Sequence, residues 1–304
     1  PVVRARMREY KYWAFAAVSI GMISSSLDHG SVNVALPTVA VHFQTDFTTV
    51  QWVTIGYALT ISALLLPMGR LSDLMGRKRV YIGGSLIFVL GALVAGMSPN
   101  LTTLVVARII EGSGAAMTQG TGMAIVIAAF PASERGKAIG LIITVIGTGA
   151  IAGPAIGGFL VDALGWRAVL LANVPVVLLG VAASMVILTD SQDTQTAQRG
   201  RDRKFDWLGA ALSTGALLTL LLALTNGHKS DWTSPIILVA FLSFAGPLAA
   251  FIWWELRTTG PLLDLRLFQR SLFSLGVSAH FLTFLGSSAA IFLTPFYLQQ
   301  ILGY

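Results

Sequence analysis

The sequence contains no cysteine, little charge and few histidines. Charged residues make up 11% of the 304-residue chain, whereas soluble domains contain about a quarter. Without cysteine, the chain can form neither disulfide bonds nor thiolate metal sites. The four histidines, His29, His42, His228 and His280, are too scattered to match the spacing of metal ligands. We therefore expect neither a metal site nor a cofactor.

Two signatures of chemistry are also missing. The chain has no G-x-x-x-x-G-K-[ST] loop, which nucleotide-driven proteins use to bind phosphates. It also has no convergent cluster of His, Asp or Cys residues of the kind that an integral membrane enzyme would need. The sequence therefore predicts that the protein is not an enzyme.

What the chain does contain is apolar sequence. Hydrophobic residues make up 55% of it, and its mean hydropathy is +0.75. Apolar runs of about twenty residues recur, long enough to cross a bilayer as helices. The first run follows a basic stretch, as in a signal peptide, but it is too long for a cleavable segment and shows no clear cleavage site before Asp28. We predict an all-α integral membrane protein. Its nine expected spans are Trp13–Leu36, Val50–Met68, Val80–Met97, Leu101–Ile127, Ala138–Leu160, Ala168–Leu188, Trp207–Leu224, Ile236–Trp254 and Leu272–Leu293.

The basic residues predict how these spans are oriented. Of the 20 Lys and Arg residues, 17 fall on the N-terminal tail and on every second connection, all on one side of the predicted membrane. Only Arg167 and Lys229 fall on the other side, and Arg108 falls inside a span. Since cytoplasmic loops retain Lys and Arg, we predict a multi-pass protein of the plasma (inner) membrane with a cytoplasmic N-terminus. The basic charge is thereby explained by topology, so we expect the lipid bilayer, and no nucleic acid, as a partner.

The longest polar stretch, DSQDTQTAQRGRDRKFD, divides six spans from the rest of the chain. Six spans followed by a basic linker are typical of one half of a pseudo-symmetric transporter. Spans seven and eight contain almost no polar residues, so we expect them to face lipid. An odd span count places Tyr304 outside, and the last residues lead toward a further span, which predicts a C-terminally incomplete chain. The predicted domains are a cytoplasmic tail (1–12), a six-span bundle (13–189), a cytoplasmic linker (190–206), two additional linker spans (207–256) and the truncated start of a second bundle (257–304).

The connection between spans two and three contains a specific motif. Gly69, Asp73, Gly76 and Arg77 fit the pattern G-x-L-x-D-x-x-G-R-[KR]. An ordinary cytoplasmic loop would explain the cations, but not these glycines or the aspartate. Glycine at a helix end permits positive φ and close backbone approach. Asp73 could pair with Arg77 or hold a helix N-terminus of an opposite half. The motif resembles the cytoplasmic signature of the major facilitator superfamily.

Other stretches support the same resemblance. Residues 108–116, RIIEGSGAA, resemble R-x-x-Q-G-x-G-A-A, with Glu111 where glutamine is usual, and residues 149–158, GAIAGPAIGG, resemble the superfamily's antiporter signature. LDHGSVNVALP, GWRAVLLANVP, PLLDLRLF and FYLQQILGY resemble its fourteen-span drug:proton antiporter branch. The resemblance covers essentially the whole chain. It implies the major facilitator transporter fold, five further spans beyond Tyr304, and efflux of drugs or antibiotics. We expect a monomer.

Ionisable residues inside spans are the strongest candidates for function, because they are costly and rare there. Asp28 lies about 12 Å from the outer end of span one, and Arg108 about 10 Å into span four, at 1.5 Å per residue. Glu111 follows Arg108 on the same helix face. We hypothesise a proton-coupling switch in which deprotonated Asp28 or Glu111 holds Arg108 and protonation frees it. A structural aspartate and a static buried ion pair remain alternatives.

Span five is rich in glycine. Gly149, Gly153 and Gly157 recur every fourth residue, which predicts a smooth face for close helix contact. Pro154 removes a backbone hydrogen bond and favours a kink, and Gly158 completes the motif. The resemblance implies a sliding, leak-tight contact between the two halves of an exchanger. Plain small-residue packing is the alternative.

Weaker signals point to a substrate cavity. Gln51, Trp52 and Tyr57 could contact substrate at the outer mouth, although interfacial aromatics occur in any membrane protein. Gln119 could line a cavity, with a structural hydrogen bond as the simpler interpretation. His29 follows Asp28 but points about 100° away from it around the helix, which favours a packing or hydrogen-bonding role.

Together these observations predict alternating-access transport. The leading hypothesis is proton-coupled efflux of hydrophobic drugs or antibiotics, with cationic ones favoured by acidic residues in an apolar cavity. Proton-coupled symport of a small metabolite is the alternative within transport. A membrane receptor is disfavoured by the short outer loops. A non-transporting fragment is a further alternative, because nine spans cannot complete two halves.

Overall fold

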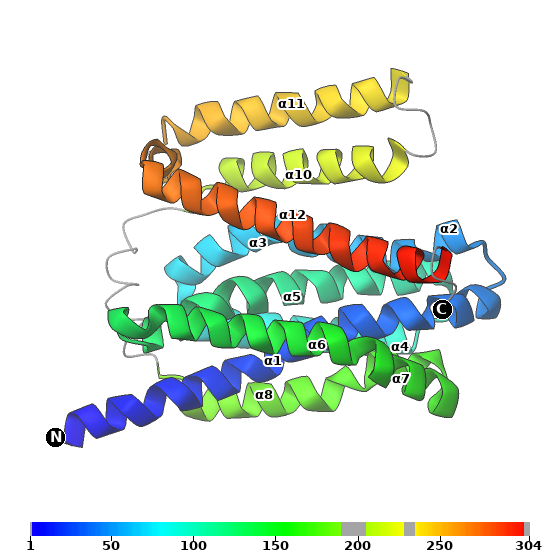
Figure 1. The fold of residues 1–304 in the computed structure, drawn as a ribbon, viewed down its shortest axis with the longest axis horizontal. Coiled ribbons are helices and arrows are strands. Elements are labelled where there is room, and N and C mark those ends of the chain that lie inside the picture. The colour runs from blue at the N-terminus through cyan, green and yellow to red at the C-terminus, as the bar shows by residue number, and fades with distance from the viewer. Residues whose placement is uncertain (1, 190–204, 228–234, 259, 301–304) are drawn as a thin grey trace.

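The computed structural model describes residues 2–189, 205–227, 235–258 and 260–300, and within these ranges every regular element is helical (Figure 1). The elements are α1 (Val2–His42), α2 (Phe47–Val50), α3 (Trp52–Met75), α4 (Arg77–Gly96), α5 (Leu101–Ala129), η1 (Ala132–Glu134), α6 (Arg135–Leu164), α7 (Trp166–Leu171), α8 (Asn173–Ile187), α10 (Trp207–Gly227), α11 (Pro235–Glu255), η2 (Leu265–Gln269) and α12 (Ser271–Gln300).

Each predicted span falls on one of these helices or on two consecutive ones. Six helical segments of the described chain are long and apolar enough to cross a membrane, and Val239–Glu255 forms a shorter apolar helix. The longest helix, α1, and α5 are not among the six, although they have 41 and 29 residues. Charged and small polar side chains lower their hydropathy, and these two helices carry the intramembrane charges. The prediction of an all-α membrane fold is confirmed.

Two predicted boundaries differ from the structure. The predicted N-terminal tail is helical from Val2 onward and is continuous with the first span, so α1 is much longer than 13–36. The predicted sixth span is divided at Ala172 into α7 and α8. Pro175 explains this break, because it lacks the backbone N–H that would bond to the carbonyl of Leu171. The predicted cytoplasmic linker lies mostly outside the described residues.

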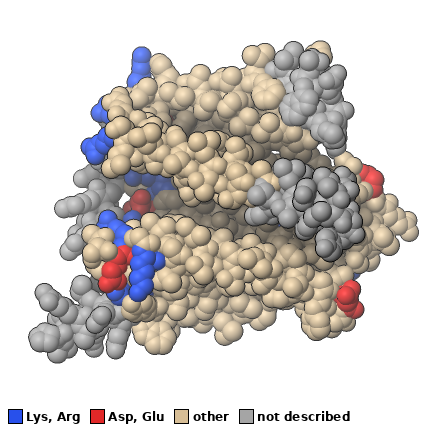
Figure 2. All heavy atoms as spheres, in the orientation of Figure 1, with Lys and Arg blue, Asp and Glu red and all other residues tan. Residues whose placement is uncertain are grey.

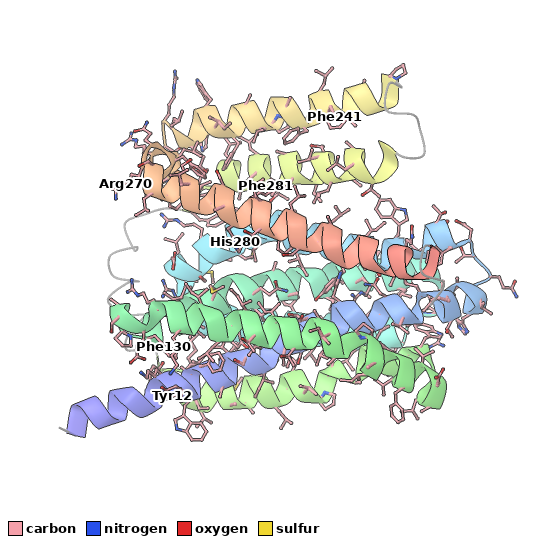
Figure 3. The ribbon with its side chains drawn as sticks, viewed as in Figure 1. Tyr12, Phe130, Phe241, Arg270, His280 and Phe281 are labelled. Carbon is pink, nitrogen blue, oxygen red and sulfur yellow. The ribbon has the colours of Figure 1, made fainter. Side chains whose placement is uncertain are left out.

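The helices run side by side, and α1 and α3–α8 form one bundle (Figure 1). α5 packs against α3 and α4, whereas α1 packs against α6 and α8. α10 lies against α3, where the Thr214 hydroxyl donates a hydrogen bond to the Ala63 carbonyl at 3.2 Å, and α11 packs on α10. The described side chains of α12 are almost all exposed, including His280, which Figure 3 labels. The two helices that were predicted to face lipid, α10 and α11, therefore lie beside the bundle, and α10 contacts it through α3.

Buried apolar side chains form three layers along the bundle. One layer lies at the end where α1 finishes and includes Val39, Val53 and Trp166. A second lies toward the opposite end and includes Val18, Tyr81 and Ile142. The third contains Tyr57, Phe88 and Val181. Because there is no hydrophobic driving force for helices to associate in lipid, close van der Waals packing within these layers stabilises the bundle.

Charged side chains gather at one end of the molecule, and a broad uncharged band follows (Figure 2). We call this the basic end; it contains Lys11 and Arg77. There the Lys11 ammonium pairs with Glu134 and lies 5.1 and 5.3 Å from the ring centroids of Tyr12 and Phe130. The two rings meet edge to face with centroids 6.0 Å apart (Figure 3). These contacts join α1 to the turn between α5 and α6.

Candidate functional site

A cluster of three charged side chains lies inside the bundle. Asp28 comes from α1, and Arg108 and Glu111 come from neighbouring turns of α5. All three side chains are fully buried. Nη1 of Arg108 lies 2.7 Å from Oδ2 of Asp28 and 2.7 Å from Oε2 of Glu111. One guanidinium nitrogen is thus shared by two carboxylates.

Neutral groups from two further helices, α3 and α8, hold this cluster in place. Asn173, the first residue of α8, donates from Nδ2 to Oδ1 of Asp28 at 3.0 Å. Nε of Arg108 donates to the backbone carbonyl of Val53 on α3 at 3.3 Å. The Arg108 guanidinium carbon lies 4.1 Å from the centroid of the Tyr57 ring. Cation–π attraction of this kind strengthens when both groups are desolvated.

Glycine lets two neighbouring helices approach the cluster. A Cβ on Gly91 of α4 would lie 2.5 Å from the backbone nitrogen of Glu111, and a Cβ on Gly112 of α5 would lie 2.8 Å from the carbonyl oxygen of Tyr57. Real Cβ atoms do not come this close to backbone atoms. Small residues in membrane bundles serve this kind of backbone contact. The cluster is therefore enclosed by packing that tolerates no larger residue at these two positions.

The hydrogen bonds are distributed unequally between the two carboxylates. Both oxygens of Asp28 accept a bond, whereas Oε1 of Glu111 and Nη2 of Arg108 are buried without a partner among the described residues. Two ionised carboxylates and one guanidinium leave a net negative charge, and an unbalanced charge is costly away from water. One proton would neutralise the cluster, and Glu111 is the carboxylate with a free oxygen to receive it.

A cavity of about 260 Å³ lies beside this cluster. It is bounded by α1, α3, α5 and α6, and Tyr57 belongs to both the cavity wall and the cluster. Two of the four predicted cavity residues, Tyr57 and Gln119, line it. The other two, Gln51 and Trp52, do not, because they form the junction between α2 and α3. The lining consists of Met22, Ser25, Ser26, His29, Tyr57, Ala58, Ile61, Ser62, Gln119 and Ile146.

The predicted cytoplasmic motif forms a tight turn at the basic end. Gly76 is the single residue between α3 and α4, and its φ of 99° is a conformation that favours glycine. Arg77 donates to Oδ1 of Asp73 from Nη2 at 3.0 Å and from Nε at 3.2 Å, and its Nη1 donates to the Ala124 carbonyl of α5. A Cβ on Gly69 would meet nothing within 4 Å. Asp73 therefore pairs with Arg77, and the Gly69 carbonyl accepts a hydrogen bond from the Ser72 hydroxyl at 2.7 Å.

The glycine motif of α6 packs against α1. A Cβ on Gly149, Gly153 or Gly157 would lie 2.6–2.8 Å from atoms of α1, whereas one on Gly158 would make only ordinary contact with Val34 at 3.9 Å. Pro154 lies within the same contact, 3.0 Å from the position of a Cβ on Gly30. Within the described residues, this glycine face packs two helices of one bundle together, and the contact between two halves of an exchanger stays a prediction. Glycines spaced by four share one side of a helix, and that side faces α1.

Sequence reasoning missed several residues of the site. Asn173 is a polar residue in an apolar span just before a proline, and that signal could have identified it. Ser25, Ser62 and His29 gave no comparable signal, since isolated serines and histidines are common in helices. His29 was expected to pack or form hydrogen bonds; its side chain lines the cavity and its ring stacks with Tyr57 at a centroid distance of 6.2 Å.

Comparison with known proteins identifies the family of this chain. Residues 18–304 match the family model of the Major Facilitator Superfamily. The chain is 34% identical over 289 residues to the multidrug resistance protein Stp of Mycobacterium tuberculosis, a match that covers 95% of this chain and 53% of Stp. It is 32% identical to the tetracenomycin C resistance and export protein of Streptomyces glaucescens, over 94% of this chain and 52% of that protein.

A third relative is named for a different role. The chain is 32% identical to the riboflavin transporter RibZ of Clostridioides difficile, and the match covers 96% of this chain and 61% of RibZ. The chain spans about half the length of the curated relatives that it matches.

Proposed function

Because the chain belongs to the Major Facilitator Superfamily, a family of transporters, we propose that it forms part of a proton-coupled antiporter that exports hydrophobic drugs or antibiotics by alternating access. Its similarity to a multidrug resistance protein and to an antibiotic export protein supports efflux as the direction of transport. The coupling ion and the direction are part of the proposal.

One observation carries the proposal: a single nitrogen of Arg108 is shared by Asp28 and Glu111 at equal distances inside the membrane region. Such a group exists in two charge states that differ by one proton. With both carboxylates ionised, each competes for the same guanidinium. With Glu111 protonated, Arg108 and Asp28 form a neutral pair, because Asp28 keeps its bonds to Arg108 and Asn173.

Protonation of the buried cluster can affect the cavity through Tyr57. Its ring contacts the Arg108 guanidinium on the cluster side, and it also lines the cavity. A shift of Arg108 between carboxylates would move the ring that a substrate touches. Proton binding and substrate binding would then favour different arrangements of the same side chains, which is the coupling that an antiporter requires.

We place the protein in the plasma (inner) membrane as a monomer with the basic end in the cytoplasm. The gathering of Lys and Arg at one end supports this orientation (Figure 2). In the cytoplasmic turn, the pairing of Asp73 with Arg77 supports a latch that closes this end in one transport state. Hydrophobic substrates fit the apolar part of the cavity wall. The cationic preference expected from the sequence gains no support there, since no carboxylate is among the described lining residues.

Proton-coupled symport of a small metabolite is the second candidate. The specific observation in its favour is the similarity to the riboflavin transporter RibZ over nearly the whole chain. The two candidates predict opposite directions of transport. In cells that express the full natural protein, an uncoupler should raise dye accumulation if the protein exports the dye and lower it if the protein imports the dye.

The proton-coupling role is tested in proteoliposomes that contain the full natural protein. Glu111→Gln should abolish transport driven by a pH gradient, while substrate exchange without a gradient continues. Asp162→Asn is the matched control, because Asp162 is an exposed carboxylate on α6 outside the cluster. Retention of gradient-driven transport in Glu111→Gln would show that Glu111 does not carry the coupled proton.

A further inference from the structure

The cavity contains groups that form hydrogen bonds and an aromatic surface, and its described lining contains no charged side chain other than the titratable His29. We infer that this cavity recognises uncharged, flat aromatic compounds with both donor and acceptor groups, and that His29 is its specificity-determining residue. The inference rests on the proposed transport function and names the substrate class for that site.

The two usual means of binding a cation are both missing from the described wall. Carboxylates attract cations, but Asp28 and Glu111 are fully buried and bonded to Arg108. An open aromatic face also attracts cations. The Tyr57 ring, however, already has the Arg108 guanidinium at 4.1 Å from its centroid. A second cation at this ring would meet a side chain that is already polarised by a positive charge.

Uncharged hydrogen-bonding groups are available instead. Ser25 and Ser26 are already occupied, since their hydroxyls donate to the carbonyls of Met22 and Ile146. Gln119 donates to the Ser25 hydroxyl at 3.3 Å, which leaves its amide oxygen as an acceptor. Ser62 and His29 form no side-chain hydrogen bond within the described structure. The cavity can therefore both donate to and accept from a ligand.

The shape of the wall favours a flat ligand. The His29 ring lies nearly parallel to the Tyr57 ring, with an interplanar angle of 24°, and the His29 side chain is exposed. Aromatic rings prefer such stacked or offset partners. Apolar side chains of Met22, Ile61 and Ile146 form the rest of the surface. The volume of about 260 Å³ lies just below the usual range of small-molecule sites, about 300–1,000 Å³, so the cavity encloses part of a drug-sized molecule.

Two fluorescent compounds with the same three-ring skeleton test the inference. Acridone is uncharged and has one N–H donor and one carbonyl acceptor, whereas N-methylacridinium is a permanent cation without an N–H. Fluorescence titration of the purified full natural protein should show acridone binding about tenfold more tightly, a difference typical of one well-placed polar interaction. This comparison needs no variant and so does not depend on the folding of one.

Variants then assign the preference to His29. His29→Asp places a carboxylate on the cavity wall and should invert the ratio, with N-methylacridinium bound about tenfold more tightly than acridone. Ser62→Ala should weaken acridone binding by about fivefold, roughly one hydrogen bond. Thr148→Ala is its matched control, because that hydroxyl lies on α6 outside the lining and donates to the Thr144 carbonyl.

The outcomes separate this inference from the proposed function. Tighter binding of N-methylacridinium by the unmodified protein, with export that an uncoupler stops, would overturn the substrate class and leave the antiporter in place. An unchanged ratio in a folded His29→Asp variant would overturn the role of His29. Tighter binding of acridone without uncoupler-sensitive export of either compound would support the recognition and contradict the proposed function.

Discussion

Asp28 and Arg108 are 80 residues apart in the chain and form a hydrogen-bonded ion pair of 2.7 Å with both side chains fully buried. A buried pair is a weak source of net stability, because desolvation offsets much of the attraction. Loss of one partner, in contrast, leaves an uncompensated charge away from water. This balance is what the proposed switch between charge states requires, and the second carboxylate, Glu111, lies at the same distance from Arg108 as an alternative partner.

Close packing of α4 on α5 should be essential to the site. In Gly91→Ala the new Cβ would lie 2.5 Å from the backbone nitrogen of Glu111, so the helices must separate. We expect a loss of about 1–3 kcal/mol, as for other overpacked positions, and weaker proton coupling. Thermal unfolding followed by size-exclusion chromatography measures the stability. Gly83→Ala on the same helix is the control, since its Cβ would meet only Met117, at 4.0 Å. Equal stability of the two variants would contradict this packing.

The glycine motif of α6 should act through α1. In Gly153→Ala the Cβ would lie 2.8 Å from the Leu27 carbonyl oxygen, next to Asp28 in the chain. We expect about 1–3 kcal/mol of destabilisation and impaired transport. Gly147→Ala on the same helix has open space around its Cβ and should retain transport. If Gly153→Ala transports normally and Gly147→Ala does not, the functional face of α6 is the opposite one.

The sequence was sufficient to predict the helices and part of the site. The rise per residue correctly placed Asp28 and Arg108 at a shared depth, and the glycine before a basic run marked the turn at Gly76. These features depend on the rise along each helix and on the predicted topology. They needed no knowledge of how helices face each other.

The rest depended on how the helices are rotated in the bundle. Helices that are apolar on all sides give no hydrophobic stripe to reveal their inner face. The sequence therefore could not show that His29 lines the cavity while Trp52 does not, or that Asn173 reaches Asp28 across 145 positions. The glycine spacing in α6 predicted a close contact but could not name α1 as its partner.

The turn at the basic end should affect gating more than stability. Asp73 and Arg77 are partly exposed, with 37% and 23% of their side chains accessible, so their ion pair contributes only about 0–1 kcal/mol. Asp73→Asn should leave unfolding nearly unchanged, weaken the outward-open state and spare proton binding at the buried cluster. Labelling of cytoplasmic cysteines introduced into the natural protein measures this balance. An unchanged balance between inward and outward states would reduce the motif to a topology signal.

The start of α2, between α1 and α3, allows a test by pH of the N-cap formed by Asp46. The Thr49 hydroxyl and backbone N–H donate to Asp46 and hold the pKa of this carboxyl below its usual value. A depressed pKa means that Asp46 stabilises the start of α2 above its unfolded pKa of about 4. This contribution is lost as the pH falls through the lower, folded pKa. NMR titration of ¹³C-labelled aspartate in nanodiscs should show it, and Thr49→Val should move the pKa upward. A pKa unaffected by Thr49→Val would exclude a contribution from the Thr49 hydroxyl.

Infrared difference spectroscopy of the purified natural protein across a pH change tests the central claim most directly, because it detects a carboxylic acid that gains or loses a proton. We predict a band from a single buried carboxyl group that disappears in Glu111→Gln and persists in Asp162→Asn. A band that persists unchanged in Glu111→Gln, or that is lost equally in Asp162→Asn, would contradict a proton held by Glu111 beside Arg108.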